Sequence, residues 1–153
     1  MPGARAPRLY SEAMLLKEQF EFQLIVVSVG ANYVPNPLHF VDYTEWVPEA
    51  IDETISLLEI LQHQFPLSHL SLSPILPQPR DFAQLDGINF VNRCVSDFCG
   101  THSIGELIFW RFRRNKQGTI DRRLFAKDGV HLSYAGVEAV EKALYDHIRW
   151  NKV

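Results

Sequence analysis

The chain has 153 residues, of which 46% are hydrophobic and 22% charged, and its net charge is −3. This length fits one domain with its own hydrophobic core over residues 1–153, and the composition excludes disorder along the whole chain. The charge gives no general attraction for DNA or an anionic membrane. No apolar run reaches the ~18 residues of a membrane span, and the N-terminus lacks an apolar signal segment, so we expect an intracellular protein.

Helices and strands alternate along the predicted chain. Helices are predicted at residues 7–20, 45–64, 82–98 and 134–150. Strands are predicted at 22–30, from 67 to either Pro74 or Pro77, and at 106–112. The helices show apolar residues every third or fourth position, whereas 22–30 is a nearly continuous β-branched run typical of a strand buried on both faces. Thr44 and Ser133 are candidate N-caps, and Trp110 is expected to be buried in the third strand.

This order predicts an α/β fold with a parallel sheet covered on both faces. Three strands make a small sheet, and no strand precedes the first helix. We therefore expect that another segment or a partner completes the sheet, or that the chain is a fragment.

The two cysteines, Cys94 and Cys99, lie on nearly opposite faces of one predicted helix and are expected to be free thiols.

Ligands of open α/β sheets bind at the carboxyl ends of the strands, and two candidate groups follow predicted strands. Asn32, after Gly30, offers an amide donor to an oxyanion, or else bonds its own backbone as an ordinary loop residue. Asp128 and His131 are spaced as a general base and its orienting carboxylate. Alternatively, Asp128 begins a turn and His131 begins the last helix.

The other histidines show no metal-ligand spacing, and no metal or cofactor is expected. A basic segment begins near the end of the last predicted strand and continues toward the last helix. It contains Arg111, Arg113, Arg114, Lys116, Arg122 and Arg123. This segment either contacts the phosphates of a nucleic acid or an acidic substrate, or is a solvated loop. It lacks the interleaved aromatic residues of a single-strand binding surface.

Three sequence blocks together resemble the SGNH hydrolase superfamily, the GDSL-type esterases and lipases. The blocks are "PGARAPRL", "VVSVGANYV" and "KDGVHLSYAG". The residues of these blocks resemble those of SGNH-like domains encoded in open reading frames of animal retroelements. The resemblance implies a flavodoxin-like three-layer α/β/α sandwich and hydrolysis of a small ester substrate by a serine mechanism. It also implies that His131 is the base, Asp128 its orienter, and Gly3 and Asn32 the oxyanion hole.

The chain departs from this family in two places. Tyr33 replaces the aspartate of the third block, and the block that carries the nucleophilic serine is missing. None of the nearby serines is expected to replace it: Ser28 is placed too far inside its strand, Ser71 and Ser73 belong to the second strand, and Ser133 is a helix cap. Since loss of a triad nucleophile costs on the order of 10⁶ in turnover, little or no esterase activity is expected from this chain alone.

Three hypotheses follow. The first is an SGNH-type esterase domain whose N-terminal strand is absent from this chain. The second is a non-catalytic module of the same fold that binds a nucleic acid or a protein. The third is a degenerate gene product without a function.

Overall fold

Three parallel strands form the centre of the protein. The computed structural model describes residues 5–35, 42–79, 84–113 and 119–152. Within these ranges the strands are β1 (Leu24–Ser28), β2 (His69–Ser73) and β3 (Gly105–Glu106), in the order β1-β2-β3. Both strand pairs are parallel, with Leu24 opposite His69 and Ser71 opposite Gly105. The predicted α/β fold with a parallel sheet is confirmed.

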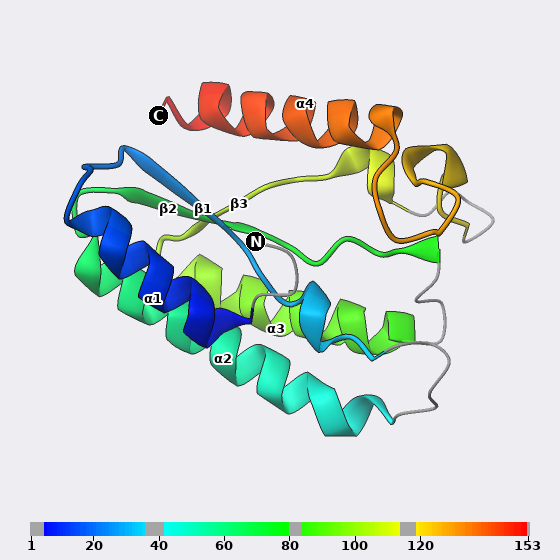
Figure 1. Ribbon diagram of the computed structural model, residues 1–153, viewed down its shortest axis with the longest axis horizontal. Coiled ribbons are helices and arrows are strands. Elements are labelled where there is room, and N and C mark those ends of the chain that lie inside the picture. Colours follow the sequence, from blue (N-terminus) through cyan, green and yellow to red (C-terminus); the bar gives the residue numbers. More distant parts are fainter. Residues whose placement is uncertain (1–4, 36–41, 80–83, 114–118, 153) are drawn as a thin grey trace.

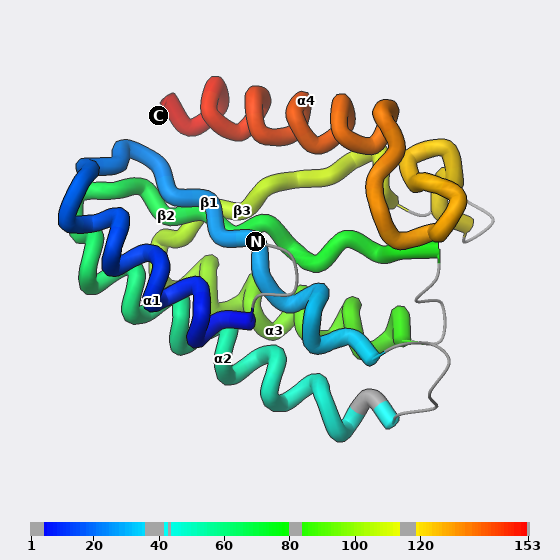
Figure 2. The backbone as a smooth tube through the Cα atoms, in the orientation of Figure 1, coloured from blue at the N-terminus to red at the C-terminus, as the bar shows by residue number. Residues whose placement is uncertain are grey.

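Helices cover the two faces of this sheet (Figures 1 and 2). They are α1 (Ala6–Lys17), α2 (Tyr43–Gln64), α3 (Leu85–Thr101) and α4 (Tyr134–Asn151). The first three lie on one face and α4 lies on the other, which gives three layers. Asp42 caps α2 by accepting the backbone N–H of Thr44, so the predicted Thr44 cap is wrong. Ser133 caps α4 as predicted.

The third strand is much shorter than the sequence predicted. Its ladder ends soon after Glu106, with a last bond from the Leu107 N–H to the Leu72 carbonyl at 2.9 Å. The chain then forms a 3₁₀ turn at Trp110–Phe112. Phe112 fills the core there, while Trp110 is 65% exposed, so its predicted burial is wrong.

Each face of the sheet has its own apolar cluster. Leu58 of α2 and Ile88 of α3 are fully buried in the cluster on one face, to which Val27 of β1 also belongs. On the other face, Leu124 and Phe125 pack beneath α4. Alternate residues of β1 and β2 therefore serve different layers, as the pleat of a strand requires.

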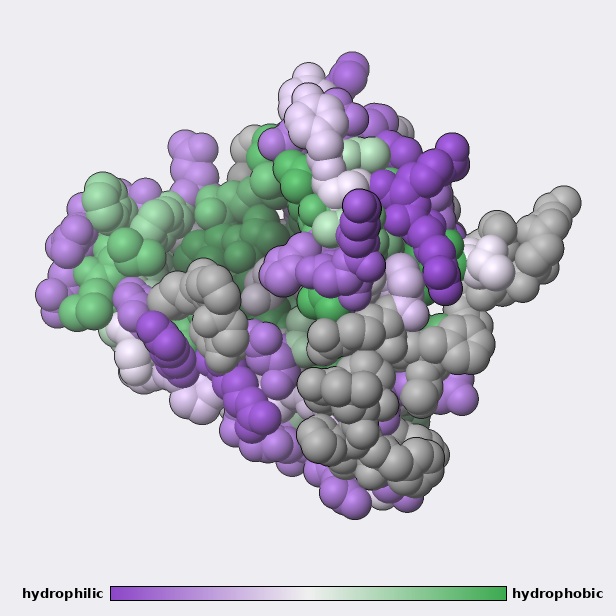
Figure 3. Space-filling view, turned by 45° about the vertical axis from the view of Figure 1, so that its right-hand side comes forward, coloured by the Kyte–Doolittle hydropathy of each residue, from purple (hydrophilic) through white to green (hydrophobic). Residues whose placement is uncertain are grey.

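β1 is an edge strand with an exposed apolar border. In the described part of the chain it pairs with β2 alone. A pocket of about 420 Å³ runs along it, lined mainly by apolar side chains of α1, β1 and α2. Figure 3 shows apolar side chains exposed in a hollow on this side of the molecule. Unpaired strand edges of this kind readily accept a further strand.

Both cysteines are free thiols, as predicted, and Cys99 is buried. None of the helices in the described ranges is long and apolar enough to cross a membrane.

Candidate active site

Asp128 and His131 form a hydrogen-bonded carboxylate–imidazole pair. The Nδ1 atom of His131 lies 2.5 Å from Oδ2 of Asp128. The other carboxylate oxygen accepts the backbone N–H groups of Val130 at 2.9 Å and of His131 at 3.0 Å. The bond from the imidazole, followed by the two backbone bonds, lowers the pKa of Asp128 to about 2. The carboxyl group is therefore ionised near neutral pH.

The pair is open to solvent. The His131 side chain is 81% exposed and that of Asp128 is 46% exposed. An ionised carboxylate accepts but cannot donate, so Nδ1 of His131 carries the proton of this bond. In the neutral imidazole, Nε2 then has a lone pair that can accept a proton. This is the tautomer that a general base requires.

A tight loop presents the two side chains. Phe125 and Leu132 form an isolated antiparallel bridge at its base, and the Ala126 N–H donates to the His131 carbonyl at 2.8 Å. Gly129 turns the chain with a φ of 69°, in the left-handed region that glycine enters without strain. The loop thus brings residues 128 and 131 to the same side of the turn.

The start of α4 packs directly against this loop. The Ser133 N–H donates to the Leu124 carbonyl at 3.0 Å. Ser133 Oγ accepts the Gly136 N–H at 3.2 Å and donates to the Arg123 carbonyl at 2.5 Å. A Cβ at Gly136 would lie 2.0 Å from the Leu124 carbonyl oxygen, so only glycine permits this approach. The two hydrogen bonds of the Ser133 hydroxyl therefore connect the loop to the start of α4.

Asn32 lies beyond the carboxyl end of β1. Gly30 has a φ of 112°, and a Cβ there would lie 2.6 Å from Cδ1 of Ile75, so this turn requires glycine. The chain continues in a 3₁₀ turn, Ala31–Tyr33, in which Asn32 is exposed. This turn and the Asp128–His131 loop both lie at the end of the sheet where the strands finish (Figure 1). Gly3, the other predicted oxyanion residue, lies outside the described residues.

Solved structures share this arrangement of strands and helices, although no family model and no curated sequence matches the chain. A GDSL-like lipase from Bacteroides thetaiotaomicron superposes with a TM-score of 0.68 at 16% identity, over 97% of this chain and 73% of the lipase. The chain has the fold of the SGNH, or GDSL-type, acylhydrolases.

Two esterases are further structural neighbours. The esterase domain of the ORF1 protein from the zebrafish ZfL2-1 retrotransposon gives a TM-score of 0.55 at 20% identity, over 97% of this chain and 85% of that domain. A variant of an acetyl-xylooligosaccharide esterase from Geobacillus gives 0.70 at 17% identity, over 95% of this chain and 68% of the esterase. The predicted flavodoxin-like, SGNH-type fold is confirmed.

Tyr33, which stands where the SGNH pattern has an aspartate, joins the Asn32 turn to two helices. Its buried hydroxyl donates to the Glu53 carboxylate of α2 and accepts the Ala6 N–H of α1 at 3.2 Å. Burial, reinforced by the bond to Glu53, raises the pKa of Tyr33 to about 12. The phenol therefore stays protonated and holds the Asn32 turn in place.

No hydrogen bond joins a serine to the His131 imidazole in the ranges that the structure describes. Ser28 is the last residue of β1 and is exposed, so it lies closer to the carboxyl edge of the sheet than the sequence predicted. Ser73 is its partner on β2, and Ser71 is buried farther along that strand. None of these three serines is hydrogen-bonded to the imidazole, and Ser133 is occupied as a cap.

The basic segment is partly occupied by contacts within the chain. The Arg113 guanidinium lies 3.9 Å from the ring centre of Trp110. Arg123 binds both carboxylate oxygens of Asp121, each at 2.9 Å, and this lowers the pKa of Asp121. Arg111 and Arg122 are exposed, and Arg114 and Lys116 lie outside the described residues.

A buried Ser71–His147 pair was missed in the sequence. The alternation of His69, Ser71 and Ser73 along β2 marks a polar face of the strand, but nothing in it identifies the partner on a helix 76 positions away. No cluster of three or more metal-binding side chains occurs among the described residues.

Proposed function

We propose that the Asp128–His131 pair is the base half of a serine ester hydrolase of the SGNH type. One observation carries the proposal: the 2.5 Å bond from Nδ1 of His131 to a carboxylate with a pKa of about 2. This bond selects the imidazole tautomer that accepts a proton at Nε2. The shared fold with known lipases and esterases supports the same reaction class.

In this reaction a serine hydroxyl attacks the carbonyl carbon of an ester, and its proton passes to Nε2 of His131. The imidazolium that forms is stabilised by Asp128. Asn32 and Gly3 donate to the oxyanion. The imidazolium returns its proton to the departing alkoxide, which leaves an acyl-serine. Water, deprotonated by the same imidazole, then attacks the acyl carbon. The imidazolium returns the proton to the serine oxygen as the acyl–serine bond breaks, which releases the carboxylic acid and restores the serine.

We further propose that the serine belongs to a strand that precedes residue 1 in the parent polypeptide and pairs with the free edge of β1. The unpaired backbone of β1 and the apolar pocket of about 420 Å³ along it support this placement. A parallel strand added there ends at the same edge of the sheet as β1. Its last residue would therefore lie at the same edge of the sheet as Asn32 and His131, where ligands of open α/β sheets bind.

Hydrolysis of p-nitrophenyl acetate tests the proposal. The polypeptide that includes the upstream strand should hydrolyse the ester, and His131→Ala should lower the rate by a factor on the order of 10⁶. Asp128→Asn should lower it by about 10⁴, because the imidazole loses its orienting carboxylate. His63→Ala is the matched control, since His63 is an exposed histidine at the end of α2, and its rate should be unchanged.

Two outcomes would overturn the proposal. One is a parent reading frame that encodes no strand with a terminal serine upstream of residue 1. The other is turnover that survives His131→Ala. The chain of 153 residues on its own should leave the ester intact, and His131-dependent turnover by it would place the nucleophile within this chain.

A second candidate function is nucleic acid binding at the basic segment. The observation that favours it is Trp110, an exposed indole with Arg113 stacked on it, since such surfaces also stack on bases. An affinity for single-stranded RNA that falls with salt and is lost in a triple Ala variant of Arg113, Arg114 and Lys116 would support it. Absence of binding at low salt would reject it.

A further inference from the structure

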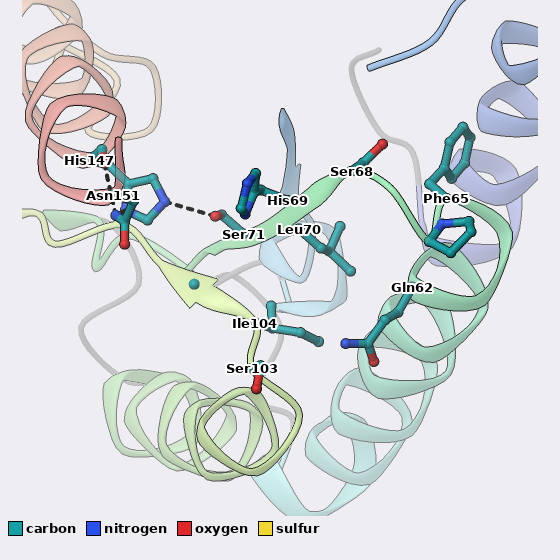
Figure 4. Close-up of a pocket in the computed structure, with 12 residues that line it drawn as sticks. Gln62, Phe65, Ser68, His69, Leu70, Ser71, Ser103, Ile104, His147 and Asn151 are labelled. Carbon is teal, nitrogen blue, oxygen red and sulfur yellow. Dashed lines mark hydrogen bonds between the residues drawn. The ribbon is translucent and has the colours of Figure 1, made fainter. Parts of the chain in front are cut away.

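A polar pocket lies at the opposite end of the sheet from Asp128 and His131. It has a volume of about 310 Å³ and opens where β2 and β3 begin, between the C-terminal ends of α2 and α4. Figure 4 shows its polar lining, which includes Gln62, His69, Ser71, Ser103, His147 and Asn151. The volume is at the lower end of the ~300–1,000 Å³ of ligand pockets, so its occupant is a small molecule.

Ser71 and His147 form the inner wall of this pocket. Ser71 is 2% exposed and His147 is 9% exposed, and their Oγ and Nε2 atoms are 2.8 Å apart. Gly105 of β3 leaves the room for this contact. A Cβ at Gly105 would lie 2.7 Å from Ser71 Oγ and 3.0 Å from Cε1 of His147.

Asn151 determines which atom donates in the Ser71–His147 bond. Its Nδ2 donates to the His147 carbonyl at 2.8 Å, which identifies it as the amide nitrogen, and it lies 3.2 Å from His147 Nδ1. Nδ1 therefore accepts, and Nε2–H donates to Ser71 Oγ. Burial lowers the pKa of His147, in agreement with a neutral ring.

This tautomer makes Ser71 a binding group and not a nucleophile. Because His147 donates to Oγ, it cannot remove the hydroxyl proton, so the serine is not activated. That proton is left without an acceptor among the described side chains and backbone groups. Ser71 Oγ already has His147 as one partner, and its hydroxyl proton can donate to an occupant of the pocket.

The rest of the lining carries no formal charge. It contains no lysine, arginine, aspartate or glutamate. The Nε2 of Gln62 donates to the His102 carbonyl at 2.7 Å, which leaves its Oε1 as an acceptor, and the amide oxygen of Asn151 is a second acceptor. The Ser71 and Ser103 hydroxyls add donors. A charged ligand would lose hydration here without gaining a counter-charge.

Apolar side chains form the remaining surface of the pocket. Phe65, Leu70 and Ile104 are all buried and border it. A ring with C–H groups on its faces and hydroxyls at its edge matches a lining of this kind. We propose that this pocket binds a small neutral polyhydroxylated molecule, a monosaccharide or a cyclic polyol, through Ser71, Ser103, Gln62 and Asn151.

Amide chemical shifts of the ¹⁵N-labelled chain would test this proposal, with D-glucose, myo-inositol and glycerol as probes. At least one probe should shift the amides around β2 and β3 saturably, while D-gluconate, which carries a carboxylate, should bind at least about tenfold more weakly. Ser71→Ala should weaken binding by about tenfold, the loss expected for one buried hydrogen bond. Ser73→Ala, on the same strand but outside the pocket, is the matched control and should bind normally.

Ser71→Ala also removes the partner of His147, so a second variant guards against a folding defect. Gln62→Met keeps the length of the side chain and removes its amide, and it should weaken binding while the amide spectrum elsewhere stays unchanged. The proposal is overturned if none of the three probes shifts these amides saturably. It is equally overturned if gluconate binds as well as the neutral probes, or if Ser73→Ala weakens binding as much as Ser71→Ala.

Discussion

The carboxylate of Asp128 holds the His131 imidazole at 2.5 Å with one oxygen and the backbone of its own loop with the other. The same side chain therefore orients the candidate base and shapes the turn that carries it. Removing the charge of Asp128 should therefore affect the orientation of His131 and the shape of the turn, although the carboxylate lies at the surface. All the hydrogen bonds of the Asp128 carboxylate described here join residues within the segment 128–131.

The depressed pKa of Asp128 predicts a stability change at low pH. The carboxyl group has a pKa of about 2 in the folded chain and about 3.9 when unfolded. Since the folded value is the lower one, the stabilisation is fully present above the unfolded pKa and is lost as pH falls toward 2. Carboxyl ¹³C shifts should place the midpoint near 2.

Asp128→Asn is the comparison for this titration. The variant should lack this part of the pH dependence when urea unfolding is followed between about pH 5 and pH 2. A wild-type Asp128 midpoint near its ordinary value would contradict the ionised pair described here.

Gly136→Ala should destabilise the loop that carries His131. The new Cβ would meet the Leu124 carbonyl oxygen at 2.0 Å, and since this atom belongs to the backbone it cannot rotate away. Overpacking of this kind costs about 1–3 kcal/mol, which exceeds the ~1 kcal/mol that alanine gains over glycine within a helix. Thermal unfolding should therefore show a lower Tm.

Gly100→Ala provides the matched helical control. Nothing lies within 4 Å of a Cβ at Gly100, near the end of α3. The free energy of unfolding should rise by about 0.5–1 kcal/mol, because only the helix preference changes. Equal effects of the two substitutions would show that the Leu124 contact does not constrain α4.

Tyr33→Phe should loosen the turn that holds Asn32. The variant removes a hydroxyl that bonds Glu53 and the Ala6 N–H, and it leaves both groups without this partner. A loss of about 1–3 kcal/mol in the free energy of unfolding is expected. Amide exchange should accelerate in α1 and at residues 30–33. Tyr145→Phe, at a position 63% exposed, should change neither.

The layout of the fold and the Asp128–His131 pair could be predicted because both depend on local sequence. Strand 24–28 is a run of β-branched and apolar residues, and the two site residues are three positions apart on one turn. The Ser133 cap was found for the same reason, since its partner Gly136 lies within the first turn of the helix.

Contacts between distant segments could not be read from the sequence. The run Ile108–Phe112 has the composition of a strand, yet the chain leaves the sheet and turns so that Phe112 packs against Phe125 while Trp110 faces solvent. The sequence marks Tyr33 only as a departure from the family pattern, because its partners Ala6 and Glu53 lie on two separate helices.

His147 predicts a second and distinct loss of stability in mild acid. Burial lowers its pKa in the folded chain, an effect that the Glu106 carbonyl partly offsets. Since the folded pKa lies below the unfolded value of about 6.5, stability is fully present above pH 6.5 and declines as pH falls toward the folded pKa. Protonation also places an N–H at Nδ1, facing the Asn151 amide nitrogen 3.2 Å away, where two donors oppose each other.

Urea midpoints measured from pH 8 to pH 5 should therefore fall in the wild type and fall less in His147→Gln, whose amide does not titrate. His63→Gln, which replaces an exposed histidine of α2, should retain the wild-type profile, and identical profiles for all three proteins would mean that the ring of His147 does not constrain α4.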